Sequence, residues 1–281
     1  MALPMAVSAG RLRTLSRYPS RNETARATEA TSDPRLADLR LTLARLEGVG
    51  RSQGEVLPLG ELGPHLPAGG LACGVLHEVT SSYADRPAAF GFTFALGSIA
   101  QTVRSGPVLF IASRRALRDY GRPYGHGLKQ LGLDPGRLLL VETGNDRDCL
   151  WTLEEALRTP GLAIVTGAVS ANLDLTAARR LNLAAAATAT PLALLRLGPE
   201  PTGPAATRWR IASAATAQAT DAAFSSSRWS VALERCRNGR PASWLIEWTH
   251  DTHRFRVVES LADRAALAQP SGDRSAQRRA G

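Results

Sequence analysis

The feature of this sequence that most constrains its fold is an alternation of short apolar runs with longer mixed runs between residues 75 and 197. The short runs are apolar at almost every position, as expected when helices cover both faces of a parallel sheet. Predicted strands occupy residues 75–79, 107–112, 137–142, 162–166 and 192–197. Predicted helices occupy residues 88–104, 125–131, 150–158 and 173–188, with Asp148 expected to cap the third. The alternation predicts an α/β fold with a mostly parallel sheet flanked by helices.

The pattern changes after residue 198, where a stretch rich in Gly and Pro is followed by four shorter runs. Predicted strands there occupy residues 207–213, 228–235, 242–248 and 253–259. The pair Asn238-Gly239 separates the second run from the third and favours a hairpin, because both residues readily adopt positive φ. We therefore expect residues 199–261 to form an antiparallel extension of the α/β core.

The remaining segments complete the predicted domain organisation. Residues 1–33 are basic and aperiodic, so we expect a disordered arm. Residues 34–50 carry leucines three and four positions apart, which predicts a helix. The α/β core is expected over residues 51–198, and a disordered tail over residues 262–281.

Charge and cysteine usage narrow the class of protein. The 281-residue chain has a formal net charge of +9, which favours an acidic partner, nucleic acid first among them. Its three cysteines lie far apart without a CxxC pair, so neither a structural zinc site nor a disulfide framework is expected. The chain has no run of about 18 apolar residues, so the sequence predicts no membrane-spanning helix. These features favour a cytoplasmic protein in a reducing compartment.

The segment between the first predicted strand and helix, residues 80–87, lies where a nucleotide-binding protein has its phosphate loop; we call it the degenerate loop. A phosphate loop reads GxxxxGK followed by Ser or Thr, because glycines let backbone N–H groups wrap the phosphates and the lysine neutralises them. In that spacing Thr80 takes the first glycine, Asp85 the second, Arg86 the lysine and Pro87 the hydroxyl position. Asp85 would repel a phosphate and Pro87 offers neither hydroxyl nor N–H, so only Arg86 keeps a suitable charge.

The other half of a nucleotide site is also incomplete. The strand at 162–166 runs into Gly167 and Ala168, without the acid that would hold magnesium through water. The single lysine of the chain, Lys129, does not follow a strand and a glycine loop. We therefore expect a structural strand–turn–helix with no catalysis, no nucleotide cofactor and no metal. An atypical ATPase that relies on Arg86 stays open as an alternative.

Arginines and tryptophans alternate in the C-terminal strands. Because side chains alternate along a strand, Arg208 and Arg210 should share one face and Trp209 should lie on the other. One interpretation puts the tryptophans in the core and the arginines in water, where they contribute little to stability. The other makes the arginine face a binding site for nucleic acid or an acidic partner. Its candidate residues are Arg208, Arg210, Arg228, Arg235 and Arg237.

A histidine pair with HxxH spacing, His250 and His253, lies between the last two predicted strands. No cysteine or carboxylate accompanies the pair to complete a zinc site. A turn is therefore the favoured interpretation.

Several stretches together resemble a known family. The approach to the degenerate loop, LPAGGLACGVLHEV, resembles the approach to the phosphate loop in RecA-type recombinases. Further characteristic stretches, in chain order, are GVLHEV, LGLDPGRLLLVE, DCLWTLEEALR, LDLTAARRLNLAA, ATRWRIAS and RWSVALERCRNGRPASWLIEWTHDTHRFRV. In the order and spacing of these stretches, the chain resembles the ImuA family over residues 36–259.

This resemblance implies a RecA-like fold with a degenerate loop. It implies a role as an accessory factor and no catalysed reaction. ImuA-type proteins are accessory factors of the bacterial SOS response, in DNA-damage-induced mutagenesis and error-prone translesion synthesis. They act with an ImuB-type protein, similar to Y-family polymerases but without polymerase activity, and with an error-prone C-family DNA polymerase. The resemblance leaves open a contact with RecA and direct binding of DNA. The related cell-division inhibitor SulA provides an alternative function.

Overall fold

The computed structural model describes residues 55–198, 203–215 and 227–261. The predicted arm (1–33), helix (34–50) and tail (262–281) lie outside the described residues. Expectations for these three segments therefore stay predictions.

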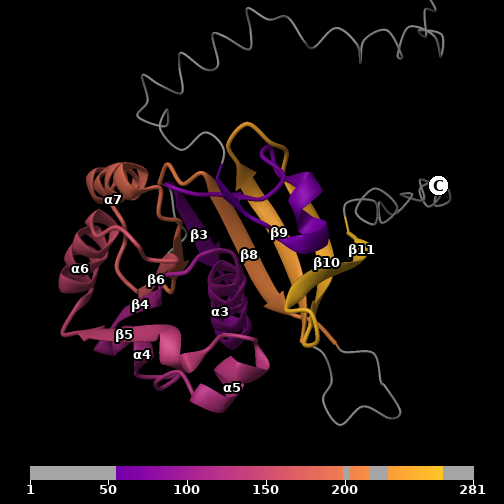
Figure 1. Cartoon of the computed structure of the whole chain (residues 1–281), viewed down its shortest axis with the longest axis horizontal. Coiled ribbons are helices and arrows are strands. Elements are labelled where there is room, and N and C mark those ends of the chain that lie inside the picture. Colours follow the sequence, from indigo (N-terminus) through magenta and orange to yellow (C-terminus); the bar gives the residue numbers. More distant parts are fainter. Residues whose placement is uncertain (1–54, 199–202, 216–226, 262–281) are drawn as a thin grey trace, which may run out of the picture. The chain divides into compact units, whose positions relative to one another are not determined.

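Within the described residues, nine strands form one sheet in the order β11-β10-β9-β8-β3-β7-β6-β4-β5 (Figure 1). The parallel strands are β3 (Leu76–Thr80), β4 (Val108–Ser113), β5 (Leu138–Thr143), β6 (Ile164–Val169), β7 (Leu192–Arg196) and β8 (Thr207–Ser213). The antiparallel strands are β9 (Arg228–Cys236), β10 (Ala242–Thr249) and β11 (Arg254–Ser260). The predicted fold class, a largely parallel sheet followed by antiparallel strands, is confirmed.

The change from parallel to antiparallel strand pairing falls one strand later in the chain than the sequence suggested. β8 was expected to open the antiparallel extension, yet it pairs in parallel with β3 and antiparallel with β9. β8 therefore joins the two halves of the sheet. The hairpin between β9 and β10 is as predicted, with Asn238 at a φ of 63°.

Helices cover both faces of the parallel strands. The described helices are α3 (Arg86–Val103), α4 (Arg114–Leu117), α5 (Gly125–Gln130), α6 (Asp146–Arg158) and α7 (Leu175–Thr188). In Figure 1, α6 and α7 lie side by side on one face, and α3 lies on the other. The cap of α6 differs from the prediction, because the side chain of Asn145 accepts from the N–H of Asp148 at 2.9 Å. No helix in the described part of the chain is both long and apolar enough to cross a membrane.

Short elements precede the main sheet. Strands β1 (Val56–Leu57) and β2 (Leu71–Ala72) pair with each other, and the 3₁₀ helix η1 (Gly60–His65) lies between them. A second 3₁₀ helix, η2 (Pro135–Arg137), leads into β5. The leucines of η1 and its flanks are buried in the core on the α3 face.

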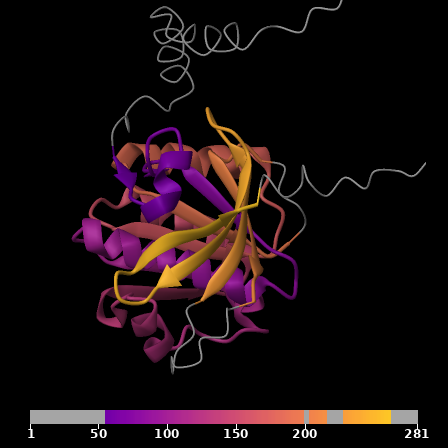
Figure 2. The same cartoon turned by 90° about the vertical axis from the view of Figure 1, so that its right-hand side faces the viewer.

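The core on the α3 face holds the tryptophans of the C-terminal strands. Figure 2 shows these strands from their own side of the molecule. Phe92 of α3 stacks on Phe255 at 5.2 Å between ring centroids and packs against Trp209 at 6.0 Å. The buried tryptophans of these strands are Trp209, Trp229, Trp244 and Trp248. Their predicted inward orientation is confirmed, so these tryptophans are core residues.

Candidate functional site

The degenerate loop lies between the carboxyl end of β3 and the start of α3, and its backbone is closed on itself. The N–H of Asp85 donates to the carbonyl of Ser82 at 3.2 Å, and the N–H of Arg86 donates to that of Tyr83 at 3.5 Å. Pro87, the next residue, has no N–H. At the helix end of the loop, two N–H groups that could bind a phosphate are therefore bonded within the loop and a third is missing.

The carboxylate of Asp85 fastens the loop to the end of β8. One oxygen accepts from the backbone N–H of Ser213 at 2.9 Å, and the other accepts from the hydroxyl of Ser82 at 2.6 Å. The bond from Ser82, followed by that from Ser213, lowers the pKa of Asp85 below its ordinary value. The loop thus carries a fixed negative charge at the position of the second glycine, which would repel a phosphate.

Arg86 and Thr80 also make structural contacts. The guanidinium of Arg86 donates to the carbonyl of Leu197 and lies 4.6 Å from the ring centroid of Tyr83. The hydroxyl of Thr80 donates to the carbonyl of Trp209 at 3.2 Å. Side chains of the loop therefore hold the sheet and helix together, which favours the structural strand–turn–helix interpretation.

One feature of this edge suits an anion. A cavity of about 380 Å³ lies beside the loop, and its lining includes Arg86, Arg115, Arg118 and Asp119. The adjoining end of β6 offers Val169 and no acid for magnesium. This arginine cavity is the observation that keeps the alternative ATPase open, although Arg86 already contacts a carbonyl.

A buried ionic cluster, which the sequence interpretation missed, lies on the α7 face of the sheet. The guanidinium of Arg208 donates to one oxygen of Glu78 from Nε at 3.1 Å and from Nη2 at 2.9 Å. Nη1 of the fully buried Arg196 lies 4.0 Å from the other oxygen of Glu78, and its Nη2 donates to the carbonyl of Ala171. Burial lowers the pKa of Arg196 from its ordinary value. Charged residues inside the apolar runs VLHEV and PLALLRL were the signal that could have found this cluster.

Arg208 and Arg210 share one face of β8, as the alternation predicted. The expectation that both face solvent is wrong for Arg208, whose side chain is 14% exposed and lies against Glu78. Arg210 forms an ion pair with Glu234 across the β8–β9 ladder. Carboxylates that the sequence interpretation did not pair with these arginines therefore offset their charge.

Other candidates on the arginine face also have partners. Arg228 lies 3.6 Å from Glu247, which also pairs with Arg256 on β11. A bulge in β9 places Arg235 opposite Arg208, and Arg235 donates to the carbonyl of Gly203 at 3.0 Å. The structure thus brings these arginines onto neighbouring strands without leaving an uninterrupted positive patch.

The last candidate of the arginine face, Arg237, follows β9 in the hairpin. Its backbone N–H donates to the carbonyl of Ala206 at 2.8 Å, and its side chain is exposed. Binding of DNA or an acidic partner by the five arginines stays a prediction.

A second missed residue, His77, lies in the middle of β3. Its Nε2 donates to the carbonyl of Ala72 at 2.7 Å, and its Nδ1 lies 2.7 Å from the hydroxyl of Thr207, which also accepts from the indole N–H of Trp209. A carbonyl only accepts, so the ring carries its proton on Nε2 and Nδ1 is an acceptor. Burial lowers the pKa of His77 to about 4. This network favours a neutral structural histidine.

The described residues offer neither a reactive buried thiol nor a cluster of metal ligands. Burial raises the pKa of Cys73 to about 11 and that of Cys149 to about 12, so neither is a ready nucleophile. The described residues contain no group of three His, Cys, Asp or Glu side chains that could hold a metal ion. His250 and His253 lie in the turn between β10 and β11, where Nδ1 of His250 is 2.7 Å from the carbonyl of Gln130.

Comparison with known proteins identifies relatives over most of the chain. No family model matches it. The protein named ImuA from Caulobacter vibrioides, in each of two strains, is 35% identical over 251 residues, which cover 82% of this chain and 99% of that protein. The match thus extends over most of this chain and nearly the full length of the relative. The chain therefore belongs to the ImuA family.

Proposed function

We propose that this protein is a non-catalytic accessory factor in DNA-damage-induced mutagenesis, which supports error-prone translesion DNA synthesis in the SOS response. The observation that carries the proposal is the match to ImuA proteins over 99% of their length. Its partners would be those that the family resemblance implies: an ImuB-type protein, an error-prone C-family DNA polymerase and, as a third candidate, RecA. The cytoplasm is the compartment in which these partners act.

The degenerate loop supports a role in binding rather than catalysis. Asp85 places a carboxylate at the second glycine position of a phosphate loop, and Arg86 donates to a backbone carbonyl. The strand–loop–helix nevertheless remains well connected to β8, so the fold is preserved without phosphate-binding chemistry. A protein-binding scaffold of this architecture needs the intact sheet and does not need a loop that binds phosphate.

A deletion in the source bacterium tests the proposal. Loss of the protein should lower the frequency of damage-induced mutants and leave cell length unchanged, and a plasmid copy should restore mutagenesis. Co-purification of the tagged protein from DNA-damaged cells identifies its partners. Unchanged mutagenesis in the deletion strain would contradict the proposal. Filaments on overexpression that a division-protein mutation suppresses would favour the SulA-like alternative instead.

The arginine cavity is the specific observation in favour of a second candidate function, an atypical ATPase. Arg86, Arg115 and Arg118 could neutralise phosphates without a lysine. The absence of an acid at the end of β6 leaves magnesium without its usual partner. We therefore rank this candidate second.

A further inference from the structure

Trp151, on α6, differs from every other tryptophan of the chain in its exposure. Its exposed fraction is 61%, whereas no other tryptophan exceeds 5%. Tryptophan is enriched in protein interfaces and among the residues that dominate binding energy. The exposed ring of Trp151 is therefore a candidate contact residue on α6.

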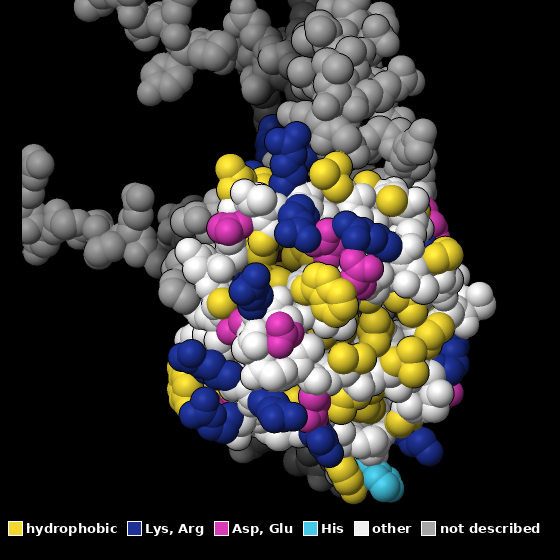
Figure 3. Space-filling view, turned by 90° about the vertical axis from the view of Figure 1, so that its left-hand side faces the viewer, with side chains coloured by type: hydrophobic (Ala, Val, Ile, Leu, Met, Phe, Trp, Pro, Cys, Tyr) yellow, Lys and Arg dark blue, Asp and Glu magenta, His cyan; other side chains and the backbone are white. Residues whose placement is uncertain are grey.

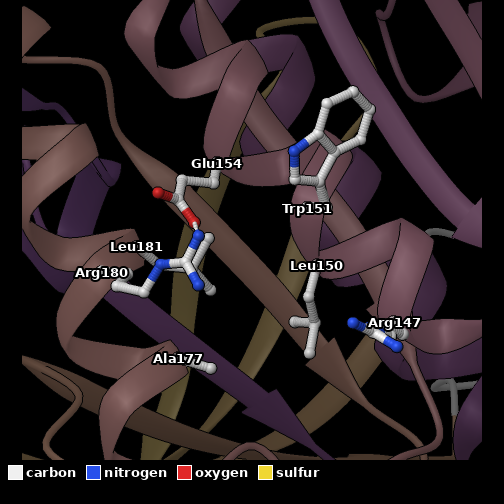
Figure 4. A pocket seen from close by; sticks show the side chains of 7 residues that line it. All are labelled: Arg147, Leu150, Trp151, Glu154, Ala177, Arg180 and Leu181. Atoms are coloured by element: carbon white, nitrogen blue, oxygen red, sulfur yellow. Dashed lines mark ion pairs between the residues drawn. The ribbon is translucent and has the colours of Figure 1, made fainter.

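A groove between α6 and α7 lies next to Trp151 (Figure 4). Its cavity of about 250 Å³ is lined by apolar and charged side chains: Leu150, Trp151, Ala177, Leu181, Arg147, Glu154 and Arg180. Figure 3, a view of the side of the molecule that carries these helices, shows apolar side chains gathered on this face with basic and acidic side chains around them. Cavities that hold drug-sized ligands measure about 300–1,000 Å³, so this one suits a single large side chain.

The charges around the groove are matched except at one position. The nearly buried Glu154 accepts from Arg158 at 2.5 Å and pairs with Arg180 at 2.6 Å, and Arg158 also pairs with Glu155 at 2.7 Å. Two arginines and two glutamates thus offset each other. Arg147 makes no ion pair with any residue that the structure describes, so the rim keeps one uncompensated guanidinium.

Arg147 and Trp151 are four residues apart on α6, and such residues lie about 5–6 Å from each other on one side of a helix. We propose that this groove, lined by Arg147, Leu150, Trp151, Ala177 and Leu181, holds a segment of a partner protein. The segment presents one large apolar side chain to the groove and, about one helical turn away, a carboxylate to Arg147. This inference rests on the proposed function, because it specifies the partner contact of an accessory factor.

Nucleic acid fits the groove less well than such a segment. A tryptophan beside an arginine can stack a base and bind a phosphate. A strand of nucleic acid, however, presents a row of phosphates, whereas Arg180, the other arginine of the lining, already pairs with Glu154. A single carboxylate needs only Arg147. One arginine without an ion pair therefore favours a protein segment with one carboxylate over a row of phosphates.

Selection of peptides tests the groove without knowledge of the partner. A library of random 16-residue peptides displayed on phage is selected on the full-length protein, without counter-selection on Trp151→Ala. Enriched peptides are then measured by fluorescence anisotropy against Trp151→Ala, Arg147→Glu and two matched controls. Arg179→Glu reverses an exposed arginine on α7, and Leu183→Ala truncates an exposed leucine there, and neither residue lines the cavity. Thermal melts verify that each variant is folded.

Enriched peptides should share an apolar residue and an acid three or four positions apart. Trp151→Ala should weaken binding about tenfold or more, as truncation of an anchor residue does. Arg147→Glu should weaken it as well, and a peptide with lysine in place of the acid should bind Arg147→Glu more tightly than it binds the wild type. The two control variants should stay within about twofold of the wild type, since distant surface side chains contribute little.

Three results would overturn the inference. Enriched peptides that bind Trp151→Ala as well as the wild type, or that are basic, would exclude the groove as their site. An oligonucleotide that displaces the peptides in a Trp151-dependent manner would assign the groove to nucleic acid. A dimer of the wild type that Trp151→Ala abolishes would assign it to a second copy of the chain.

The same variants separate this inference from the proposed function. If the deletion lowers induced mutagenesis and both Trp151→Ala and Arg147→Glu restore it fully, the proposed function stands and the groove inference fails. If the groove binds acidic peptides as expected but the deletion leaves mutagenesis unchanged, the proposed function fails and the groove stands.

Discussion

The carboxylate of Glu78 on β3 accepts two hydrogen bonds from the guanidinium of Arg208 on β8, a residue 130 positions away in the sequence. The two strands are parallel neighbours, and Glu78 lies directly opposite Arg208 in their register. This pair links the strand before the degenerate loop to the strand that begins the C-terminal half of the sheet. Because Arg196 of β7 lies on the other side of Glu78, one buried carboxylate connects three adjacent strands.

Glu78→Gln should destabilise the protein by about 3–5 kcal/mol, because it leaves two buried guanidinium groups without a counter-charge. The matched control is Glu234→Gln, which removes the partner of Arg210 in a partly exposed pair and should cost less than about 1 kcal/mol. Urea unfolding of both variants measures the difference. Equal costs for the two substitutions would mean that the buried cluster contributes no more than a surface pair.

Trp209→Ala should cost about 3–5 kcal/mol, because it removes a buried ring that packs against Phe92 and donates a hydrogen bond to Thr207. Trp151→Ala is its control, and should change the free energy of unfolding by less than about 0.5 kcal/mol. Both values come from denaturant melts followed by circular dichroism. A large cost at Trp151 would show that this exposed side chain stabilises the α6–α7 pair rather than awaiting a partner.

The strands and helices of the core could be predicted because each is encoded by its own local pattern. Continuous apolar runs such as PVLFIA, which contains most of β4, suit a position between two layers of helix. The parallel pairing of β8 with β3 could not be predicted in this way. Strand order depends on which edges meet in space, and the alternating sequence of β8 suits either direction.

The site was predicted less completely, because its contacts join residues far apart in the chain. Alternation correctly placed Arg208 and Arg210 on one face, but it does not indicate that a loop around Gly203 covers Arg208. The degenerate loop was recognisable by its residues, whereas the use of Asp85 to bind Ser213 was not. The cap of α6 shows the same limit at short range, since Asn145 and Asp148 were both suitable residues.

Magnesium-ATP should show no saturable binding at micromolar concentrations and no turnover above background. The reason is that Asp85 places a fixed carboxylate at the second glycine position, and the N–H groups of Asp85 and Arg86 are already bonded within the loop. Isothermal titration calorimetry and a phosphate-release assay measure both properties. Micromolar affinity that Arg86→Ala or Arg115→Ala removes would favour the atypical ATPase.

Arg210→Glu should change the affinity for a labelled single-stranded oligonucleotide by less than about threefold, because Glu234 already offsets this charge. Arg208 is a poor choice for such a reversal, since its substitution would disturb the buried pair with Glu78. Fluorescence anisotropy at two salt concentrations gives the affinity and its salt dependence. A tenfold loss together with a shallower salt dependence would establish the arginine face as a DNA site, since each released phosphate contact removes about 0.7 from the log–log slope.

The stability of the protein should fall as the pH drops from about 6.5 to about 4, in part through His77. Burial lowers the pKa of this ring from 6.5 to about 4 in the folded state, whereas the unfolded chain keeps the ordinary value. Between these two pH values the unfolded state binds more protons than the folded state. Lowering the pH therefore favours the unfolded state and reduces the free energy of unfolding. At about 1.4 kcal/mol per pKa unit, the full contribution is about 3.5 kcal/mol, present above pH 6.5 and lost by pH 4.

Urea melts at pH 5.0 and pH 7.5 measure this dependence, and His77→Gln is the variant that should reduce it. Carboxylates and other histidines also titrate in this range, so the informative quantity is the difference in slope between wild type and variant. A titration of the His77 ring by nuclear magnetic resonance provides a check that does not depend on how well the variant folds. A ring that protonates near pH 6.5 in the folded protein would contradict the hydrogen bonds that Nε2 donates to Ala72 and Nδ1 accepts from Thr207. In that case the junction between β3 and β8 would be more open to solvent than its contacts indicate.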